Sequence, residues 1–418
     1  MVLIKTAILI LARLLHFRRH RIKMALPTMS DFIFNTTRTI IHELGAARRL
    51  AQICLEQNAR RVLLVTDGGI VDAGLLKGLL PGFTEKQMEV RAYQDVEPDP
   101  SDSTVLAAVE AAVDMGAELI VGVGGGSSMD VAKLVAVLAH PECEQHLVDM
   151  YGVDQITGSR LPLIQVPTTA GTGSEVTPIA IVTTGETTKA GVVSSALQPD
   201  IALLDAELTV GLPAHVTAAT GVDAMVHAIE AYTSAHKKNP ISDMLAKQAL
   251  QLLSQNIRLA VADGSNLTAR SNMLLGALLA GQAFANAPVA AVHALAYPLG
   301  GHFHIPHGLS NSLVLPHVLR FNAAFAHQEY AELAPFIMGD DYNELKSADS
   351  ADVTEAFICW IEKLIEGLAL PARLRDCRVP QDFLPKLAED AMQQTRLLVN
   401  NPRQVSEQDA LKIYQAAY

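Results

Sequence analysis

The chain has 418 residues, half of them hydrophobic and 18% charged, which is ample material for two buried cores and unlike a disordered chain. Acidic side chains outnumber basic ones by 44 to 32, so the formal net charge is −12. A surface of that sign repels phosphate backbones, which argues against a nucleic-acid partner.

The first 28 residues differ from the rest because they carry six basic residues and no acidic one. Their apolar run at 7–15 is interrupted by Arg13 and is too short to span a bilayer. Most of the charge follows this run and no clear A-x-A-like cleavage site is present, unlike a secretory signal. The segment 1–28 is therefore a membrane-surface or targeting helix, an inert tail, or a start upstream of a true start at Met24 or Met29. We favour the last two alternatives.

The cysteines lie far apart and form no CxxC pair, which argues against a disulfide framework. They are Cys54, Cys143, Cys359 and Cys377. This usage predicts core residues or free thiols in a reducing compartment, and we expect a cytoplasmic protein.

Strand-like and helix-like segments alternate from residue 61 onward. This order is typical of a doubly wound, Rossmann-like α/β domain that binds a dinucleotide, which we predict for residues 29–213. We expect Asp102 or Ser103 to cap the second helix. The predicted strands are 61–67, 89–93, 118–126 and 161–167, and the predicted helices are 71–80, 103–115 and 128–138.

Beyond the Gly-Leu-Pro at 211–213 the strand-like runs disappear. Long segments rich in Ala and Leu follow with helical period, at 217–233, 242–262 and 269–285. The sequence therefore predicts an all-helical second domain at 214–418.

Two loops of small residues follow predicted strands. The first, in GVGGGSSMDVAK (122–133), runs from Gly124 through Gly125 and Gly126 to the helix start at Ser127. Bare glycines let backbone N–H groups approach a phosphate, which the helix N-terminus also favours. The second, PTTAGTGSEVT (167–177), offers the hydroxyls of Thr168, Thr169, Thr172 and Ser174. Either loop alone could be an ordinary turn, but two at strand ends of one sheet favour a dinucleotide site.

Asp67 ends the first strand of the predicted α/β domain. A carboxylate at this position can accept hydrogen bonds from both ribose hydroxyls of an adenosine. It also repels a 2′-phosphate, so it favours NAD over NADP. A helix N-cap is the alternative role for this residue.

The strongest chemical signal is a set of metal-ligand residue types. Asp223 and His227 are four residues apart in a predicted helix, so both project from one face. A carboxylate with several imidazoles suits iron or zinc, and a metal with an open position could polarise an alcohol or carbonyl oxygen opposite a nicotinamide. The spacing does not choose among the four histidines of segment 293–308, which are His293, His302, His304 and His307.

The ordered set GGGSSMD, PTTAGTGSE, GVDAMVHAIEAY and HALAYPLGGHFHIPHG resembles the iron-containing (group III) alcohol dehydrogenases, whose fold is like that of dehydroquinate synthase. The resemblance covers nearly the whole chain, and it implies NAD, Fe²⁺ with Zn²⁺ as an occasional substitute, and a dimer or larger homo-oligomer. It implies metal ligands at Asp223, His227, His293 and His307, with His302 and His304 in supporting or structural roles. The implied cofactor contacts are Asp67, Asp99, Gly125, Gly126, Ser127, Thr168, Thr172 and Lys189.

One position departs from the family pattern. Many relatives have a histidine four residues after the third ligand, where it can assist proton transfer, but this chain has Tyr297. Its phenol could hydrogen-bond the substrate, or a water or ribose hydroxyl could relay the proton instead. Tyr297 is thus a candidate catalytic residue or a pocket-lining aromatic.

We therefore predict a metal-dependent oxidoreductase that transfers a hydride between NAD(H) and a small alcohol or aldehyde. Glycerol dehydrogenase, maleylacetate reductase and dehydroquinate synthase are alternatives of the same fold. The motif segments carry few Lys or Arg residues, which favours a neutral, fairly apolar alcohol over an acid substrate. A non-catalytic protein that binds NAD or metal is the alternative outside the enzymes, and the intact ligand set and loops argue against it.

Overall fold

A parallel sheet organises the N-terminal half in the computed structural model, which describes residues 31–185 and 188–418. Within these residues the sheet has six strands in the order β1-β9-β6-β4-β2-β3, all paired in parallel. The prediction for segment 1–28 lies outside the described residues. The strands are β1 (Thr39–His42), β2 (Arg61–Val65), β3 (Glu89–Tyr93), β4 (Leu119–Gly124), β6 (Leu163–Pro167) and β9 (Ile201–Leu204).

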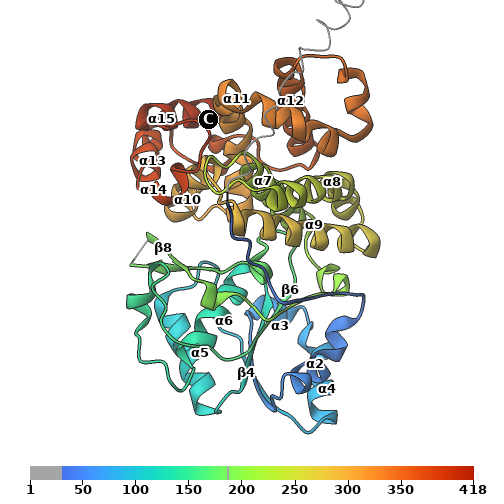
Figure 1. The fold of residues 1–418 in the computed structure, drawn as a ribbon, viewed down its shortest axis with the longest axis vertical. Helices are drawn as coiled ribbons and strands as arrows, with labels where there is room; N and C mark the ends of the chain where they lie inside the picture. Colours follow the sequence, from blue (N-terminus) through green and yellow to red (C-terminus); the bar gives the residue numbers. More distant parts are fainter. Residues whose placement is uncertain (1–30, 186–187) are drawn as a thin grey trace, which may run out of the picture. The chain divides into compact units, whose positions relative to one another are not determined.

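Helices cover both faces of this sheet (Figure 1). Alternate residues of β2 enter different cores: Val62 and Leu64 belong to one apolar cluster, and Leu63 and Val65 to the other. Burial on both faces explains why the strands read as continuous apolar runs rather than as alternating ones. The helices of this half are α2 (Leu50–Glu56), α3 (Gly68–Asp72), α4 (Leu76–Glu85), α5 (Asp102–Asp114) and α6 (Gly126–Leu138).

The predicted strands and helices of this half are present, with two corrections. The predicted helix 71–80 is wrong as one element, because α3 and α4 are separated by a turn in which Gly74 has φ of 73°. The predicted N-cap of α5 is also wrong, because Ser101 accepts the hydrogen bond from the backbone N–H of Thr104.

A small second sheet was not predicted from the sequence. Strands β7 (Ile179–Thr184) and β8 (Thr188–Val193) form an antiparallel pair, and β5 (Gly152–Val153) pairs with β8 in parallel. Thr183 also forms a parallel bridge with Ser101 at the start of α5. The pair β7–β8 therefore lies beside the strand ends of the main sheet, where it carries Lys189.

The rest of the chain is helical, which confirms the predicted fold class. The last strand of the main sheet ends at Leu204 and the first long helix begins at Ala214, while the domain boundary at 213 remains a prediction. The helices are α7 (Ala214–Thr233), α8 (Pro240–Ala262), α9 (Leu267–Asn286), α10 (Ala291–Phe303), α11 (His307–Met338), α12 (Ser350–Gly367), α13 (Leu384–Ala391), α14 (Thr395–Leu398) and α15 (Glu407–Ala417).

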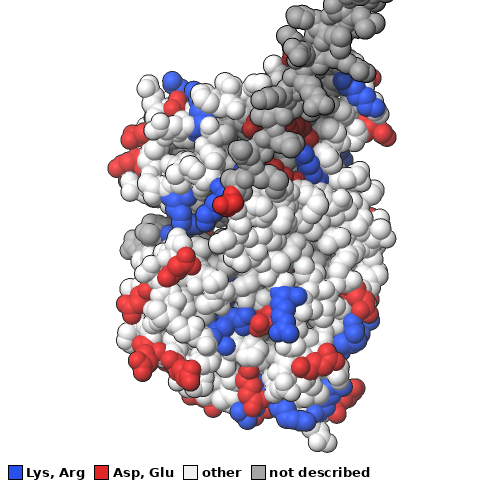
Figure 2. Space-filling view, viewed as in Figure 1, with Lys and Arg blue, Asp and Glu red and all other residues white. Residues whose placement is uncertain are grey.

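Two further findings concern the whole described chain. All four cysteines are free thiols, as predicted. Among the described residues no single helix is long and apolar enough to cross a membrane, and the pair α9–α10 meets the length and composition test only when joined across a 106° bend. Figure 2 shows acidic and basic side chains interspersed over the α/β half on the face drawn.

Candidate active site

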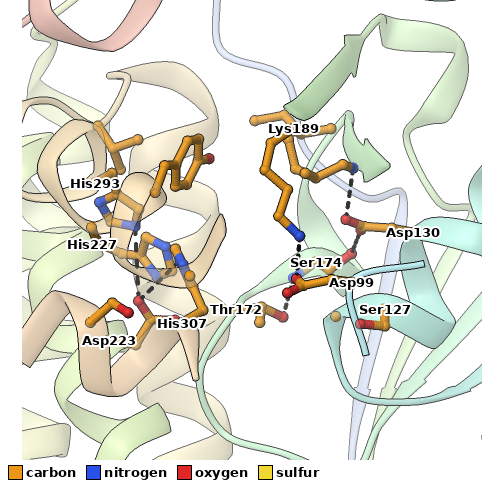
Figure 3. A pocket seen from close by; sticks show the side chains of 18 of the residues that line it. Asp99, Ser127, Asp130, Thr172, Ser174, Lys189, Asp223, His227, His293 and His307 are labelled. Atoms are coloured by element: carbon orange, nitrogen blue, oxygen red, sulfur yellow. Dashed lines mark hydrogen bonds and ion pairs between the residues drawn. The ribbon is translucent and has the colours of Figure 1, made fainter. Parts of the chain in front are cut away.

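One pocket of about 210 Å³ is lined by both halves of the described chain. Figure 3 shows side chains from the strand-end loops facing side chains from the helices across it. The sheet half contributes the predicted site residues Asp99, Gly126, Ser127, Thr172 and Lys189, and the helical half contributes Asp223, His227, His293, Tyr297 and His307.

Three of the predicted metal ligands bring their ligand atoms together. Asp223 lies within α7, His293 within α10, and His307 is the first residue of α11. The Oδ1 atom of Asp223 is 3.8 Å from Nε2 of His293 and 3.6 Å from Nε2 of His307. The three ligand atoms all lie within 4.8 Å of one another, a separation that one cation could bridge.

His227, the fourth predicted ligand, lies beside this group rather than within it. Its ring stacks on that of His293, with centroids 4.7 Å apart, and on that of Phe284 at 4.3 Å. Burial lowers the pKa of His227 to about 3. The imidazole is therefore neutral at ordinary pH, which is the form that binds metals.

Two buried residues that the sequence analysis did not identify orient the group. The Glu230 carboxylate accepts a hydrogen bond from Nδ1 of His293 at 2.7 Å, and further bonds from the N–H groups of Ala290 and Val292. Because Nδ1 donates to Glu230, Nε2 of His293 faces the pocket as an acceptor. Both residues have a sequence signal: Glu230 is three residues after His227, and Asn311 is four residues after His307.

Asn311 marks the point on which the ligand atoms converge. Its Nδ2 atom lies 2.5 Å from Oδ1 of Asp223, 3.4 Å from Nε2 of His293 and 3.2 Å from Nε2 of His307. Three acceptors thus point at one donor group, in the way that they would point at a cation. The Oδ1 atom of Asn311 and Nδ1 of His227 are buried and find no hydrogen-bond partner within residues 31–185 and 188–418.

This donor set fits a divalent first-row metal. Burial opposes ionisation of Asp223, but the neighbouring imidazoles and the Asn311 amide outweigh it and hold the pKa of Asp223 below its ordinary value. Desolvation within the pocket also lowers the pKa of His307, although its side chain stays 42% exposed. An ionised carboxylate beside neutral imidazoles is the combination that iron or zinc binds.

Facing this group, the glycine loop brings bare backbone to the pocket. Helix α6 begins at Gly126, directly after β4, so its free N–H groups point out of the strand end. A Cβ atom on Gly126 would lie 3.0 Å from Cγ2 of Thr172, which leaves little room for a side chain. The two loops also join directly, because the N–H of Thr168 donates to the carbonyl of Gly124.

Lys189 and Asp99 form an ion pair of 2.6 Å at another wall of the pocket. The ammonium group of Lys189 also donates to Oγ1 of Thr183, on the neighbouring strand. Asp99 has a positive φ of 57°, and its carbonyl accepts from Thr183. The unpredicted second sheet is thus what places Lys189 opposite Asp99.

The structure does not bring every predicted cofactor residue to the pocket. Gly125 and Thr168 lie in the two loops but do not line the pocket, and Asp67 lies between β2 and α3. Asp67 caps α3 by accepting from the N–H of Ile70, and its other oxygen accepts from Ser128 at 3.1 Å. Its alternative role as an N-cap is therefore present, while a ribose contact remains a prediction.

Two histidines of segment 293–308 lie outside the metal group. His302 pairs with Asp390 at 2.7 Å, and His304 is an exposed residue at the end of α10 with φ of 52°. The geometry therefore separates the four histidines, which spacing alone left unresolved.

A buried lysine holds together the elements that form one side of the pocket. The Nζ atom of Lys133, in α6, donates to Oγ of Ser174 at 2.6 Å, to Oγ1 of Thr177 and to the carbonyl of Ile179. Burial lowers the pKa of Lys133. These bonds tie α6 to the 167–177 loop and to β7.

Comparison with known proteins identifies the family. Models described as "Iron-containing alcohol dehydrogenase" and "Fe-containing alcohol dehydrogenase family, C-terminal" match residues 37–206 and 217–418. Long-chain-alcohol dehydrogenase 1 of Geobacillus thermodenitrificans is 40% identical over 377 residues, covering 90% of this chain and 93% of the relative. The chain belongs to the iron-containing alcohol dehydrogenases.

Comparison with solved structures agrees with this membership. A 1,3-propanediol oxidoreductase has a TM-score of 0.88 and 35% identity, over 93% of this chain and 100% of the other. Sulfoacetaldehyde reductase from Bifidobacterium kashiwanohense, solved in complex with NAD⁺, has a TM-score of 0.81 and 28% identity, over 93% and 99%. The predicted class is thereby confirmed: the chain is an NAD-linked oxidoreductase of alcohols and aldehydes of the iron-containing family.

Proposed function

We propose that this enzyme holds a divalent metal, Fe²⁺ or alternatively Zn²⁺, with Asp223, His293 and His307, and that His227 completes the ligand set. The observation that carries the proposal is the convergence of the three ligand atoms within 4.8 Å in the pocket that the glycine loop also lines. When bound there, the metal would act as a Lewis acid toward an alcohol or carbonyl oxygen.

The chain's residues on the opposite wall would hold the dinucleotide. The N–H groups at the start of α6, near Gly126 and Ser127, suit a pyrophosphate, and Thr172 offers a hydroxyl beside them. Asp67 follows β2 and contacts Ser128 of α6, a position that suits the adenosine ribose. Asp99 and Lys189 lie further along the same pocket, where they can contact the nicotinamide end. NAD would accept or deliver the hydride.

Tyr297 is the proposed hydrogen-bond donor to the reacting oxygen or to a bridging water. Its ring lies 5.8 Å from that of His307, and it lines the same pocket. Burial raises the pKa of its phenol, so the hydroxyl keeps its proton near neutral pH and can donate it in a hydrogen bond. A residue that only lined the pocket would leave kcat nearly unchanged when replaced by Phe.

We also propose a cytoplasmic homo-oligomer, a dimer or larger. The four free cysteines support the location, because thiols persist in reducing compartments whereas disulfides form in oxidising ones. Size-exclusion chromatography with light scattering measures the oligomeric state, and a monomer at micromolar concentration would refute that part of the proposal.

The test follows NADH absorbance with short primary alcohols and diols, using protein stripped of metal and then supplied anaerobically with Fe²⁺ or Zn²⁺. We expect metal-dependent turnover in the wild type and a loss of at least about 100-fold in His293→Ala, together with loss of bound metal. His302→Ala is the matched control, because His302 lies on the same helix but pairs with Asp390. Activity that is indifferent to metal, or equal losses in both variants, would refute the proposed ligand set.

A further inference from the structure

An arginine from the far end of the chain lies in the substrate pocket. Arg396 is a solvent-exposed residue of the short helix α14, and it also lines the same pocket as Asp223, His293 and Tyr297. Within the described residues its guanidinium has no ion pair and no hydrogen-bond partner, whereas its backbone carbonyl accepts from Asn400. An arginine offers five donors, so this pocket presents an unused cationic donor group.

No carboxylate of the pocket accounts for this charge. Asp99 is paired with Lys189 at 2.6 Å, and Asp223 belongs to the metal group. Asp130 accepts from Oγ of Ser174 at 2.6 Å and from the N–H of Ile181 at 3.0 Å. Arg396 therefore does not serve to neutralise a protein carboxylate in this part of the chain.

Neighbouring residues locate the guanidinium. A Cβ atom on Gly191 would lie 3.6 Å from Nη2 of Arg396, and Gly191 pairs with Ile181, which lines the pocket. Both Arg396 and Tyr297 line this pocket, and the charge of Arg396 partly offsets the rise that burial causes in the pKa of the Tyr297 phenol. The guanidinium thus lies near Gly191 of β8, in the pocket that also holds Tyr297, whose ring neighbours that of His307.

Apolar side chains also line this pocket. Ile179 and Ile181 come from β7, and Ala296 and Ile305 from the helical half. A substrate whose carbonyl or hydroxyl oxygen lies at the metal group would place its carbon chain along these side chains. The far end of a short chain would then meet Arg396.

We propose that Arg396 is a specificity-determining residue that binds an anionic group at the far end of the substrate. The substrate class is a short aldehyde, or its alcohol, that carries a terminal carboxylate or sulfonate. The proposal rests on the proposed function, since it uses the same pocket. In the reduction, the aldehyde carbon receives the hydride of NADH and its oxygen receives a proton, giving the alcohol and NAD⁺, while the terminal anion does not react.

The experiment compares 4-oxobutanoate with butanal, which has a methyl group in place of the carboxylate. We expect the wild type to prefer 4-oxobutanoate in kcat/KM, and Arg396→Gln to lose this preference by about tenfold or more, mainly through KM. Arg396→Lys should retain part of it, because an ammonium keeps the charge without the planar fork. Arg375→Gln is the matched control, since Arg375 is exposed like Arg396 but lies outside the pocket.

A binding measurement separates this proposal from the proposed function. Calorimetric titration of the NADH-loaded enzyme with 4-hydroxybutanoate and with 1-butanol measures binding alone, because an alcohol cannot react with the reduced cofactor. If the anion binds more tightly than 1-butanol and Arg396→Gln abolishes this difference, the role of Arg396 is supported. That result would hold even if the enzyme reduced no aldehyde, because a lack of turnover would refute only the proposed reaction. Equal binding of both ligands, or equal losses for both in Arg396→Gln, would overturn the role of Arg396.

Discussion

Glu230 shows how one side chain prepares a metal ligand. The buried carboxylate accepts three hydrogen bonds, from two backbone N–H groups at the start of α10 and from Nδ1 of His293. It therefore fixes both the helix start and the tautomer of the imidazole that the helix carries. Such partners raise the basicity of a ligand and hold its ring in place.

We predict that Glu230→Gln lowers metal affinity about 10-fold and Glu230→Ala up to about 100-fold, because the imidazole loses its orienting acceptor. The amide oxygen of Gln can still accept the two bonds that share one oxygen of Glu230, so its loss should be smaller. Competition with a chelator, followed by metal analysis, measures the affinity without reference to turnover. Glu366→Gln, at an exposed position of α12, is the control. Unchanged metal affinity in Glu230→Ala would show that the residue serves the fold alone.

At the same scale, sequence reasoning reached some residues and missed others. Residue type and helical spacing indicated Asp223 and His227, whereas the choice of His293 and His307 came from family resemblance. Arg396 was missed because its neighbourhood in the pocket depends on contacts between α14 and β8 that no local pattern encodes. The expectation of a neutral substrate was based only on the charges in the motif segments. Arg396 lies outside those segments, so it did not enter that expectation.

The contact between α6 and the loop that follows β6 encloses a second buried ionisable group besides Lys133. Glu175 is 2% exposed, and burial raises its pKa to about 7, although Lys133 partly offsets this. A carboxyl group whose pKa is raised in the folded state stabilises the protein fully below the ordinary pKa of the group, which is 4.5 for a glutamate. That contribution is lost as pH rises through about 7.

We predict that Glu175→Gln flattens this part of the pH dependence. Relative to the variant, the wild type should lose roughly 2 to 3 kcal/mol of its free energy of unfolding between pH 5 and pH 8. Urea unfolding of both proteins at the two pH values measures the difference. Glu110→Gln, at an exposed position of α5, should change nothing. Parallel pH profiles for wild type and Glu175→Gln would mean that Glu175 has the same pKa in both states.

Elements were predictable where their pattern is local. Buried parallel strands such as β2 and β4 are short apolar runs, because both of their faces are covered. The edge strand β1 and the pair β7–β8 are largely exposed or half-buried, so their composition carries no such signal. Lys189 was placed by family resemblance alone, since the strand that carries it was not predicted.

The two halves of the molecule meet through glycine backbones. Gly173, in the 167–177 loop, has φ of 60°, and a Cβ atom on Gly281 of α9 would lie 2.8 Å from its Cα. No side chain fits in that contact without backbone movement. The same loop carries Thr172 and Ser174, which line the pocket from the sheet side. The 167–177 loop therefore determines both how the two halves pack and the shape of the pocket wall on the sheet side.

We predict that Gly281→Ala destabilises the protein by about 1 to 3 kcal/mol and also weakens NADH binding, because the loop must move away from α9. Urea unfolding measures the first effect and NADH fluorescence titration the second. Gly78→Ala is the matched control, since a Cβ atom there meets nothing within 4 Å. Metal affinity should stay close to that of the wild type, because the metal group lies on α7, α10 and α11. A variant that loses stability but binds NADH normally would show that the strain is absorbed by α9, and that the dinucleotide wall does not depend on how the halves pack.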